Sequence, residues 1–206
     1  MDDIARAMRA LYDSHADEYV DTTGSYDHFP GLRDEVDRFI AKTPASGPVL
    51  DLGCGVGRDS QYFLAHSRPT VAVDISLEML RITRERCFNS TSLRLVLADM
   101  GEFPFGDGTF LGVWVCASLL HVPSERMEHI LREIARIVRR GGIVSISMKA
   151  GRGEGYRTGC SLAGRRWFTL VEPSEFAASL SAAGFTELEI ISSGRREWFI
   201  AEAIRC

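Results

Sequence analysis

The chain has 206 residues, of which 45% are hydrophobic and 25% charged, with a formal net charge of −4 at pH 7. This length suits one catalytic domain with a single core, the negative charge argues against a large nucleic-acid footprint, and no stretch is apolar enough for a membrane helix. The five cysteines form no metal-binding pair and the acidic start differs from a secretory signal, so we expect reduced thiols in a cytoplasmic protein.

The first forty or so residues predict two helices. Apolar and aromatic residues recur at helical spacing over residues 2–20, and a second helix is predicted over 31–42, before a Pro/Ser/Gly stretch that ends it. We expect residues 1–42 to form a helical lid over a site. The aromatic residues concentrated in this lid are Tyr12, Tyr19, Tyr26, His28 and Phe29.

Residues 49–57, Val-Leu-Asp-Leu-Gly-Cys-Gly-Val-Gly, predict a buried strand that breaks into a tight turn. Glycine at every second position permits positive φ angles and close approach of the backbone to a ligand. Such a turn also occurs in ordinary packing of a strand on a helix, so the motif alone is weak. Asp51 stands just before the break.

Two further apolar runs end in an acidic residue, at Asp74 and at Asp99. An acid at the end of the second strand of a βαβ unit is placed to accept hydrogen bonds from ribose hydroxyls. Any single aspartate before a helix is equally an N-cap candidate. Three in succession, starting with Asp51, favour convergence at one edge of a parallel sheet.

With these segments the chain resembles the class I S-adenosylmethionine-dependent methyltransferases, from about residue 12 to residue 206. The resemblance implies that the glycine turn holds the methionine part of the cofactor. Asp74 would bind the ribose, and Asp99 with Met100 the adenine. Arg33, from the lid, would pair with the methionine carboxylate. The full set assigned to the cofactor is Tyr19, Arg33, Asp51, Gly53, Gly55, Asp74, Ile75, Met79, Asp99, Met100, Cys116 and Ser118.

Residues 110–121 match the family's fourth motif, a strand that runs into the site, although its usual acid is Gly112 here. His121 follows this strand near the expected methyl position and is the candidate general base. The alternative is a histidine that only packs at a strand end. Enzymes that methylate exocyclic amines of bases or glutamine amides carry an Asn/Asp-Pro-Pro-Tyr/Phe sequence there. This chain has Cys-Ala-Ser-Leu at 116–119, which favours a small molecule.

The last third of the chain completes an α/β pattern. Its predicted elements are a helix over 125–140 ended by Gly141 and Gly142, a strand over 143–149, a helix over 174–183, and strands over 186–192 and 197–205. The turn between the last two strands is too short for a helical crossover, so they form an antiparallel hairpin. We therefore predict one domain, 1–206, with a Rossmann-like doubly wound, mostly parallel seven-stranded sheet and a C-terminal antiparallel hairpin.

The segment 150–173 is predicted to cap the acceptor pocket. It is rich in arginine and holds few acids. Because arginine forks suit carboxylate or phosphate oxygens and aromatic rings offer flat walls, we expect an anionic group to be gripped here. The alternative is a solvated glycine-rich loop. The candidate substrate residues are Tyr156, Arg157, Arg165, Arg166 and Trp167.

The sequence thus predicts in-line transfer of a methyl group from S-adenosylmethionine to an O or N atom of a small metabolite or natural-product intermediate, leaving S-adenosylhomocysteine. No nucleic acid, membrane or metal is expected, and no oligomeric state is indicated. Two alternatives stay open. One is a non-catalytic module of this fold that binds the cofactor or a partner. The other is a nicotinamide-dependent reductase, which the Gly-x-Gly-x-Gly spacing and the lack of a Tyr-x-x-x-Lys pair disfavour.

Overall fold

Seven strands form one sheet in the order β3-β2-β1-β4-β5-β9-β8. The computed structural model describes residues 2–158 and 162–206. The strands are β1 (Val49–Leu52), β2 (Thr70–Asp74), β3 (Leu93–Leu97), β4 (Phe110–Cys116), β5 (Val138–Lys149), β8 (Phe185–Ser192) and β9 (Trp198–Arg205). The first five are parallel, whereas β9 is antiparallel to both β5 and β8. The predicted fold is confirmed.

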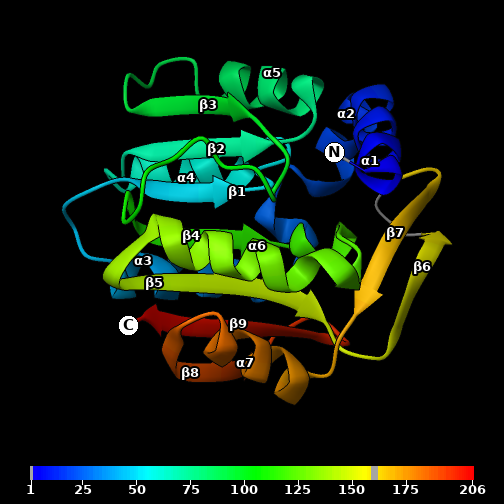
Figure 1. Cartoon of the computed structure of the whole chain (residues 1–206). Helices are drawn as coiled ribbons and strands as arrows, with labels where there is room; N and C mark the ends of the chain where they lie inside the picture. Colours follow the sequence, from blue (N-terminus) through cyan, green and yellow to red (C-terminus); the bar gives the residue numbers. More distant parts are fainter. Residues whose placement is uncertain (1, 159–161) are drawn as a thin grey trace.

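Helices cover both faces of the sheet (Figure 1). They are α1 (Asp3–Ser14), α2 (Ala16–Thr23), α3 (Leu32–Lys42), α4 (Arg58–Ala65), α5 (Leu77–Arg86), α6 (Ser124–Ile137) and α7 (Pro173–Ala182), with short 3-10 turns η1 (Tyr26–His28) and η2 (Leu119–His121). Helices α6 and α7 lie on the near face in Figure 1, and α3 and α4 on the far face. Helices α1 and α2 lie beyond the carboxyl ends of the parallel strands. Within residues 2–158 and 162–206, none of these helices is long and apolar enough to cross a lipid bilayer.

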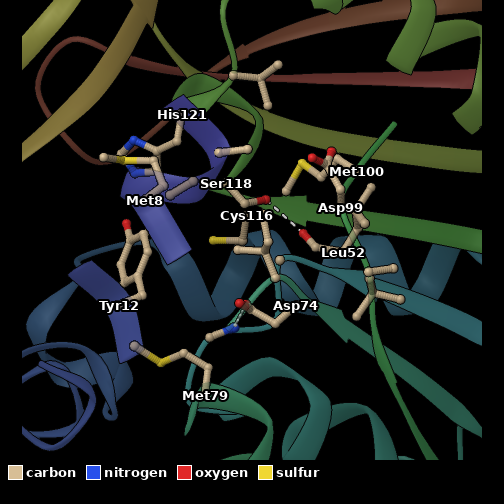
Figure 2. A pocket seen from close by; sticks show the side chains of 18 of the residues that line it. Met8, Tyr12, Leu52, Asp74, Met79, Asp99, Met100, Cys116, Ser118 and His121 are labelled. Atoms are coloured by element: carbon tan, nitrogen blue, oxygen red, sulfur yellow. Dashed lines mark hydrogen bonds between the residues drawn. The ribbon is translucent and has the colours of Figure 1, made fainter. Parts of the chain in front are cut away.

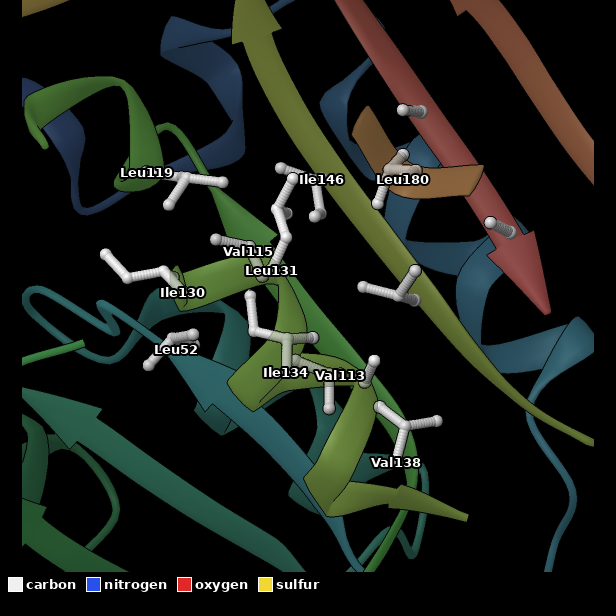
Figure 3. Close-up of a cluster of buried hydrophobic side chains, with 14 of the residues drawn as sticks. Leu52, Val113, Val115, Leu119, Ile130, Leu131, Ile134, Val138, Ile146 and Leu180 are labelled. Atoms are coloured by element: carbon white, nitrogen blue, oxygen red, sulfur yellow. The ribbon is translucent and has the colours of Figure 1, made fainter. Parts of the chain in front are cut away.

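The main core lies between α6 and the centre of the sheet (Figure 3). Ile130, Leu131 and Ile134 repeat at helical spacing on one face of α6 and are fully buried against Val113 and Val115 of β4. Burying each such side chain stabilises the fold by about 1.5–3 kcal/mol. This packing fixes the carboxyl end of β4, where the candidate site residues follow.

The N-terminal helix differs from the prediction, because residues 2–20 form two helices that meet at His15. His15 has φ −127° and ψ 24°, outside the helical range. The Ser14 hydroxyl donates to the Leu11 carbonyl, and Nδ1 of His15 lies 3.0 Å from the same oxygen. Side chains that bond to a helix carbonyl compete with continuation of the helix. The break lets the two helices follow different directions around the site.

The predicted glycine cap of α6 is also wrong. The helix ends at Ile137, and Gly141 and Gly142 lie within β5. The pairing with β4 shifts register between Phe110 and Gly112, which face Val138 and Ile143. A Cβ on Gly142 would lie within 2.9 Å of two backbone oxygens. Gly141, with φ +75°, and Gly142, where the chain comes too close to itself for a side chain, therefore permit a bulge in the strand.

The described part of the segment 150–173 is mainly two paired strands, where a loop was the alternative. Strand β6 (Gly153–Thr158) pairs antiparallel with β7 (Arg165–Leu170). The hairpin stands at the carboxyl edge of the sheet, next to α1 (Figure 1). Phe168 of β7 is buried in the main core, so the hairpin is anchored to the domain.

A buried ion pair ties the lid to the sheet. Asp59, 4% exposed, accepts hydrogen bonds from Nε and Nη2 of Arg58, at 2.8 and 3.0 Å. The same carboxylate accepts from the Tyr26 hydroxyl (2.8 Å) and from Nε1 of Trp114 (2.9 Å). Burial alone would raise the pKa of Asp59, but the Arg58 charge and these hydrogen bonds hold it below its usual value. One carboxylate thus joins η1, α4 and β4.

We expect Asp59→Ala to destabilise the protein by about 3–5 kcal/mol, because it leaves the largely buried Arg58 guanidinium without its carboxylate and removes the acceptor of the Tyr26 and Trp114 donors. Urea denaturation measures the loss. The matched control is Asp37→Ala, which removes an exposed carboxylate that also accepts from a tyrosine hydroxyl, that of Tyr62. It should change the free energy of unfolding by no more than about 0.5 kcal/mol. Equal losses in the two variants would contradict the role given to Asp59.

Candidate functional site

Two cavities open at the carboxyl edge of the parallel strands and share Tyr19, Cys116, Ala117 and His121. The first, about 100 Å³, lies over the ends of β1, β2 and β3. The second, about 470 Å³, lies between β4, β5, the hairpin and the loop from β8 to β9. The strand order reverses between β1 and β4, and such a switch point is where open α/β sheets bind ligands.

The glycine turn closes the floor of the first cavity. Gly53 has φ +73°, and a Cβ there would lie 2.3 Å from Cβ of Ser118 and 2.9 Å from Cε of Met100. The Ser118 hydroxyl donates to the Leu52 carbonyl at 2.7 Å, as Figure 2 shows. The ends of β1 and β4 are therefore in direct contact. Only glycine at position 53 leaves the backbone open to the cavity.

Asp74 is the acidic group with oxygens facing the first cavity from the end of β2 (Figure 2). Its carboxylate accepts from the backbone amides of Gly55 and Ser76, both at 2.9 Å. Burial raises its pKa to about 6, against these hydrogen bonds, which lower it. The two amides orient the carboxylate, and its remaining lone pairs can accept from a ligand hydroxyl.

Asp99 also lines the first cavity but is bound to a partner that the sequence did not indicate. Its oxygen Oδ1 lies 2.5 Å from Nη2 of Arg126, and Arg126 in turn contacts Asp2 at 2.7 Å. The Gly101 amide donates to the same carboxylate. Asp99 therefore holds the wall between β3 and α6. Arg126 is one arginine among many in the sequence, and only the fold brings it to Asp99.

Most residues assigned to the cofactor meet in this cavity. Those that line it are Tyr19, Gly53, Gly55, Asp74, Ile75, Met79, Asp99, Met100, Cys116 and Ser118. Asp51 lies below the floor instead, where it accepts from the Ser60 hydroxyl at 2.6 Å. Burial, with the charge of Asp59, raises the pKa of Asp51 to about 7. Asp51 supports the turn and α4 from the interior.

The structure places Arg33 away from both cavities. It is exposed on α3, with its guanidinium over the rings of Tyr26 and Tyr62, 5.3 and 5.7 Å from their centroids. Those two rings draw it to the outer face of the lid. Arg58, directly after the glycine turn, lines the second cavity instead, and its Nη2 lies 3.7 Å from Sγ of Cys116.

His121 lies where the two cavities join. Its Nδ1 is 2.6 Å from the Trp167 carbonyl of β7. Because a carbonyl oxygen only accepts, Nδ1 carries the proton and Nε2 is left with a lone pair. Burial lowers the pKa of His121 to about 4, and the nearby Arg166 charge adds to this effect. The ring is therefore neutral at pH 7 and presents a proton acceptor.

The hairpin divides the predicted substrate residues between its two faces. Arg157 and Arg166 line the second cavity, together with Phe168. Tyr156, Arg165 and Trp167 alternate with them and do not line either cavity described for this chain. The Arg165 guanidinium lies over the Tyr156 ring instead, 5.9 Å from its centroid. Successive side chains of a strand point to opposite faces, which accounts for the division.

The second cavity also contains residues that the sequence analysis passed over. They are Lys149 at the end of β5, Arg195 and Arg196 from the turn between β8 and β9, and Trp198 at the start of β9. That turn was interpreted only as a hairpin connection. Its closeness to the site follows from β9 lying beside β5, a contact between distant parts of the chain.

Known methyltransferases are similar to this chain in sequence and in fold. Residues 49–142 match the family described as "Methyltransferase domain". A malonyl-[acyl-carrier protein] O-methyltransferase of Pectobacterium atrosepticum is 36% identical over 62% of this chain and 49% of its own length. The matches to the first two curated relatives span 38% and 49% of their lengths, so the chain covers half or less of each.

Two solved structures share the fold over nearly the whole chain. The 1,6-didemethyltoxoflavin-N1-methyltransferase of Burkholderia thailandensis, with 1,6-didemethyltoxoflavin and S-adenosylhomocysteine bound, has a TM-score of 0.73 at 20% identity, covering 100% of this chain and 91% of its own. The [4+2]-cyclase SpnF has a TM-score of 0.77 at 18% identity, covering 98% of this chain and 96% of its own.

We expect the imidazole of His121 to remain neutral, with the proton on Nδ1, down to about pH 5. The reason is its burial, which lowers the pKa to about 4. Nitrogen-15 NMR of the histidine rings between pH 8 and pH 5 measures this, and His121→Asn identifies the signal by its loss. Titration of that signal near the ordinary value of about 6.5 would show that the ring is not enclosed.

Proposed function

We propose, from the match of residues 49–142 to the methyltransferase-domain family, that this chain transfers a methyl group from S-adenosylmethionine to an O or N atom of a small molecule. The observation that carries the proposal is the meeting of two cavities at Cys116, Ala117 and His121. One cavity suits the cofactor and the other an acceptor. Their junction is the point where a methyl group can pass between them.

The residues of the first cavity fit S-adenosylmethionine. The open backbone at Gly53 and Gly55 leaves room for the methionine end, beside Tyr19. The Asp74 carboxylate would accept hydrogen bonds from the ribose hydroxyls. Met79 and Met100 would pack against the adenosine, and flexible methionine side chains can adjust the narrow cavity to it. When bound, the sulfonium supplies an already activated methyl group.

The work left to the protein is positioning, exclusion of water and handling of one proton. His121 would accept the proton of an acceptor hydroxyl or amine at Nε2, while the Trp167 carbonyl holds the ring in orientation. A pKa near 4 makes the neutral ring a weak base in the empty site. It also ensures that the ring is in its proton-accepting form, and that it passes the proton readily to solvent.

The small-molecule class is supported from two sides. Residues 116–119 read Cys-Ala-Ser-Leu. The chain therefore lacks the Asn/Asp-Pro-Pro-Tyr/Phe motif that binds the planar amino groups of bases and of glutamine amides. The relative and one of the structures named above are described as a malonyl-[acyl-carrier protein] O-methyltransferase and a 1,6-didemethyltoxoflavin-N1-methyltransferase. A metabolite or natural-product intermediate is the corresponding acceptor here. A cytoplasmic location and the absence of nucleic-acid and membrane partners remain predictions.

The lid and the cap keep their predicted roles within this proposal. Tyr12 and Tyr19, from α1 and α2, line the first cavity, and their rings meet edge to face at 5.5 Å. The hairpin of residues 153–170 forms one wall of the second cavity. Residues 1–42 would close over the cofactor, and 150–173 over the acceptor.

A second candidate is a protein of this fold that binds the cofactor without transferring its methyl group. The structural similarity to a protein described as a [4+2]-cyclase favours this second candidate, because it indicates that the same fold can serve a reaction other than methyl transfer. Release of labelled methyl groups to a panel of small acids, phenols and amines distinguishes the two. Binding of S-adenosylmethionine with no transfer to any compound favours the second candidate. Binding of a nicotinamide dinucleotide in its place favours a reductase.

We expect Asp74→Ala to weaken S-adenosylhomocysteine binding by about tenfold to a hundredfold, since a hydrogen bond to a charged group contributes about 1.5–3 kcal/mol. Calorimetry at pH 7.5 measures the change. Wild-type affinity should also fall as the pH drops below about 6, the raised pKa of Asp74. The charged carboxylate accepts hydrogen bonds from the ribose hydroxyls, and protonation removes its charge. Binding of S-adenosylhomocysteine should therefore be strong above that pH and weak below it.

The pH dependence should disappear in Asp74→Ala. The control variant Asp107→Ala removes a carboxylate from an exposed ion pair with Arg136, and it should behave as the wild type. Unchanged affinity in Asp74→Ala would contradict the assignment of the first cavity to the cofactor.

A further inference from the structure

The second cavity carries an excess of positive charge. Within the described residues its lining includes no carboxylate. The cationic side chains that line it are Arg58, Lys149, Arg157, Arg166, Arg195 and Arg196. They come from α4, β5, the hairpin and the turn between β8 and β9, so segments distant in sequence deliver the same charge to one space.

Four of these cations have carboxylate neighbours. Arg58 is bound to Asp59, and Nη2 of Arg195 lies 3.1 Å from Oε2 of Glu35. Lys149 and Arg196 both approach Glu197, at 3.5 and 3.8 Å. These pairs compensate their charges from outside the cavity. They therefore do not by themselves indicate a ligand.

Arg157 and Arg166 differ, because no ion pair is found for either among residues 2–158 and 162–206. Arg166 is only 6% exposed, and its Nε is buried without a hydrogen-bond partner. Its guanidinium lies over the Phe168 ring, 5.3 Å from the centroid, and beside Tyr12, where its charge opposes the rise that burial causes in the pKa of the tyrosine hydroxyl. A buried cation with an unused donor is costly unless an acceptor reaches it.

The two arginines are also direct cross-strand partners, since Arg157 of β6 faces Arg166 of β7 in the register of the hairpin. Like charges directly opposite one another destabilise a pair of antiparallel strands. An anion between the two guanidinium groups converts this repulsion into two attractions. Charge and register therefore point to both arginines, and burial to Arg166, while Arg157 is exposed.

We propose that the acceptor enters the second cavity as an anion, with carboxylate or phosphate oxygens held between Arg157 and Arg166. This inference rests on the proposed function and specifies its substrate class. The apolar body of the acceptor would lie against Phe168, Trp198 and Leu120, which line the same space.

The anion serves as an anchor and is not the atom that is methylated. Arg157 and Arg166 line only the second cavity, whereas His121 lies at the junction with the first. A hydroxyl or amine elsewhere on the acceptor would therefore reach His121 while the anion stays between the arginines. Arginine forks at a fixed spacing select such a bound orientation.

The experiment uses the full chain saturated with S-adenosylhomocysteine and measures binding of benzoate, phenyl phosphate and benzamide by calorimetry at pH 7. Benzamide is a planar neutral analogue of benzoate. We expect at least one of the two acids to bind at least tenfold more tightly than benzamide, and the preferred acid identifies a carboxylate or a phosphate. Equal binding of benzamide and both acids, or no binding of either acid, would overturn the proposal.

Three variants make the test specific. Arg157→Gln and Arg166→Gln should weaken binding of the preferred acid at least tenfold and leave S-adenosylhomocysteine affinity unchanged. Arg165→Gln is the matched control, with the same loss of charge on the neighbouring, outward position of β7, and should change neither. If Arg166→Gln weakened only S-adenosylhomocysteine, the arginine would serve the cofactor carboxylate and the proposal would be wrong, although the proposed function would stand.

The melting temperature distinguishes binding of the acceptor from a purely structural role of the arginines. In the ligand-free protein, Arg157→Gln should keep or raise the melting temperature, because it removes repulsion from a pair of facing cations. A fall in melting temperature, with acid binding reduced only in proportion to the folded fraction, would mean that the arginines support the hairpin and do not bind the acceptor.

Discussion

The contact between the ends of β1 and β4 is the constraint on which the site depends. The Ser118 hydroxyl holds the Leu52 carbonyl, and Gly53 lies so close to Ser118 that no side chain fits between them. This closes the floor of the sheet edge while leaving bare backbone above it. The first cavity lies over β1 and the second extends beyond β4, so their junction lies where these strands touch. A larger residue at position 53 would separate the strands or fill the cofactor space.

The second cavity is built from long-range pairings that meet at this junction. Through its Nδ1, His121 is tied to the carbonyl of Trp167 in the hairpin, so the imidazole ring and the hairpin wall of the second cavity are positioned together. The alternation of β7 then directs Arg166 and Phe168 inward. The buried Asp59 network fixes Arg58 on the opposite wall. Every cation that lines the cavity therefore has a carboxylate neighbour within the described residues, except the two hairpin arginines.

The sequence predicted the parts of the site that follow from local pattern. Apolar runs ending in Asp74 and Asp99, and glycines at 53 and 55, lie where strand ends of a parallel sheet must meet. It missed what depends on distant partners. Arg126, at the start of α6, reaches Asp99 only because the fold brings the segment after β3 close to that helix, and Arg33 is drawn away by two tyrosine rings. Glycines at 141 and 142 carry the same local signal for a bulge as for a helix cap. The residues of the hairpin that face the second cavity could not be predicted before the bounds of its two strands were known.

In the proposed complex the first cavity holds S-adenosylmethionine with its methyl group facing the second cavity. A crystal structure with bound S-adenosylhomocysteine would show this arrangement. We expect the ribose hydroxyls on the Asp74 carboxylate, the amino-acid end beside Gly53 and Tyr19, and the sulfur directed toward His121 at the junction. A ligand bound elsewhere, or with its sulfur turned away from the second cavity, would contradict it.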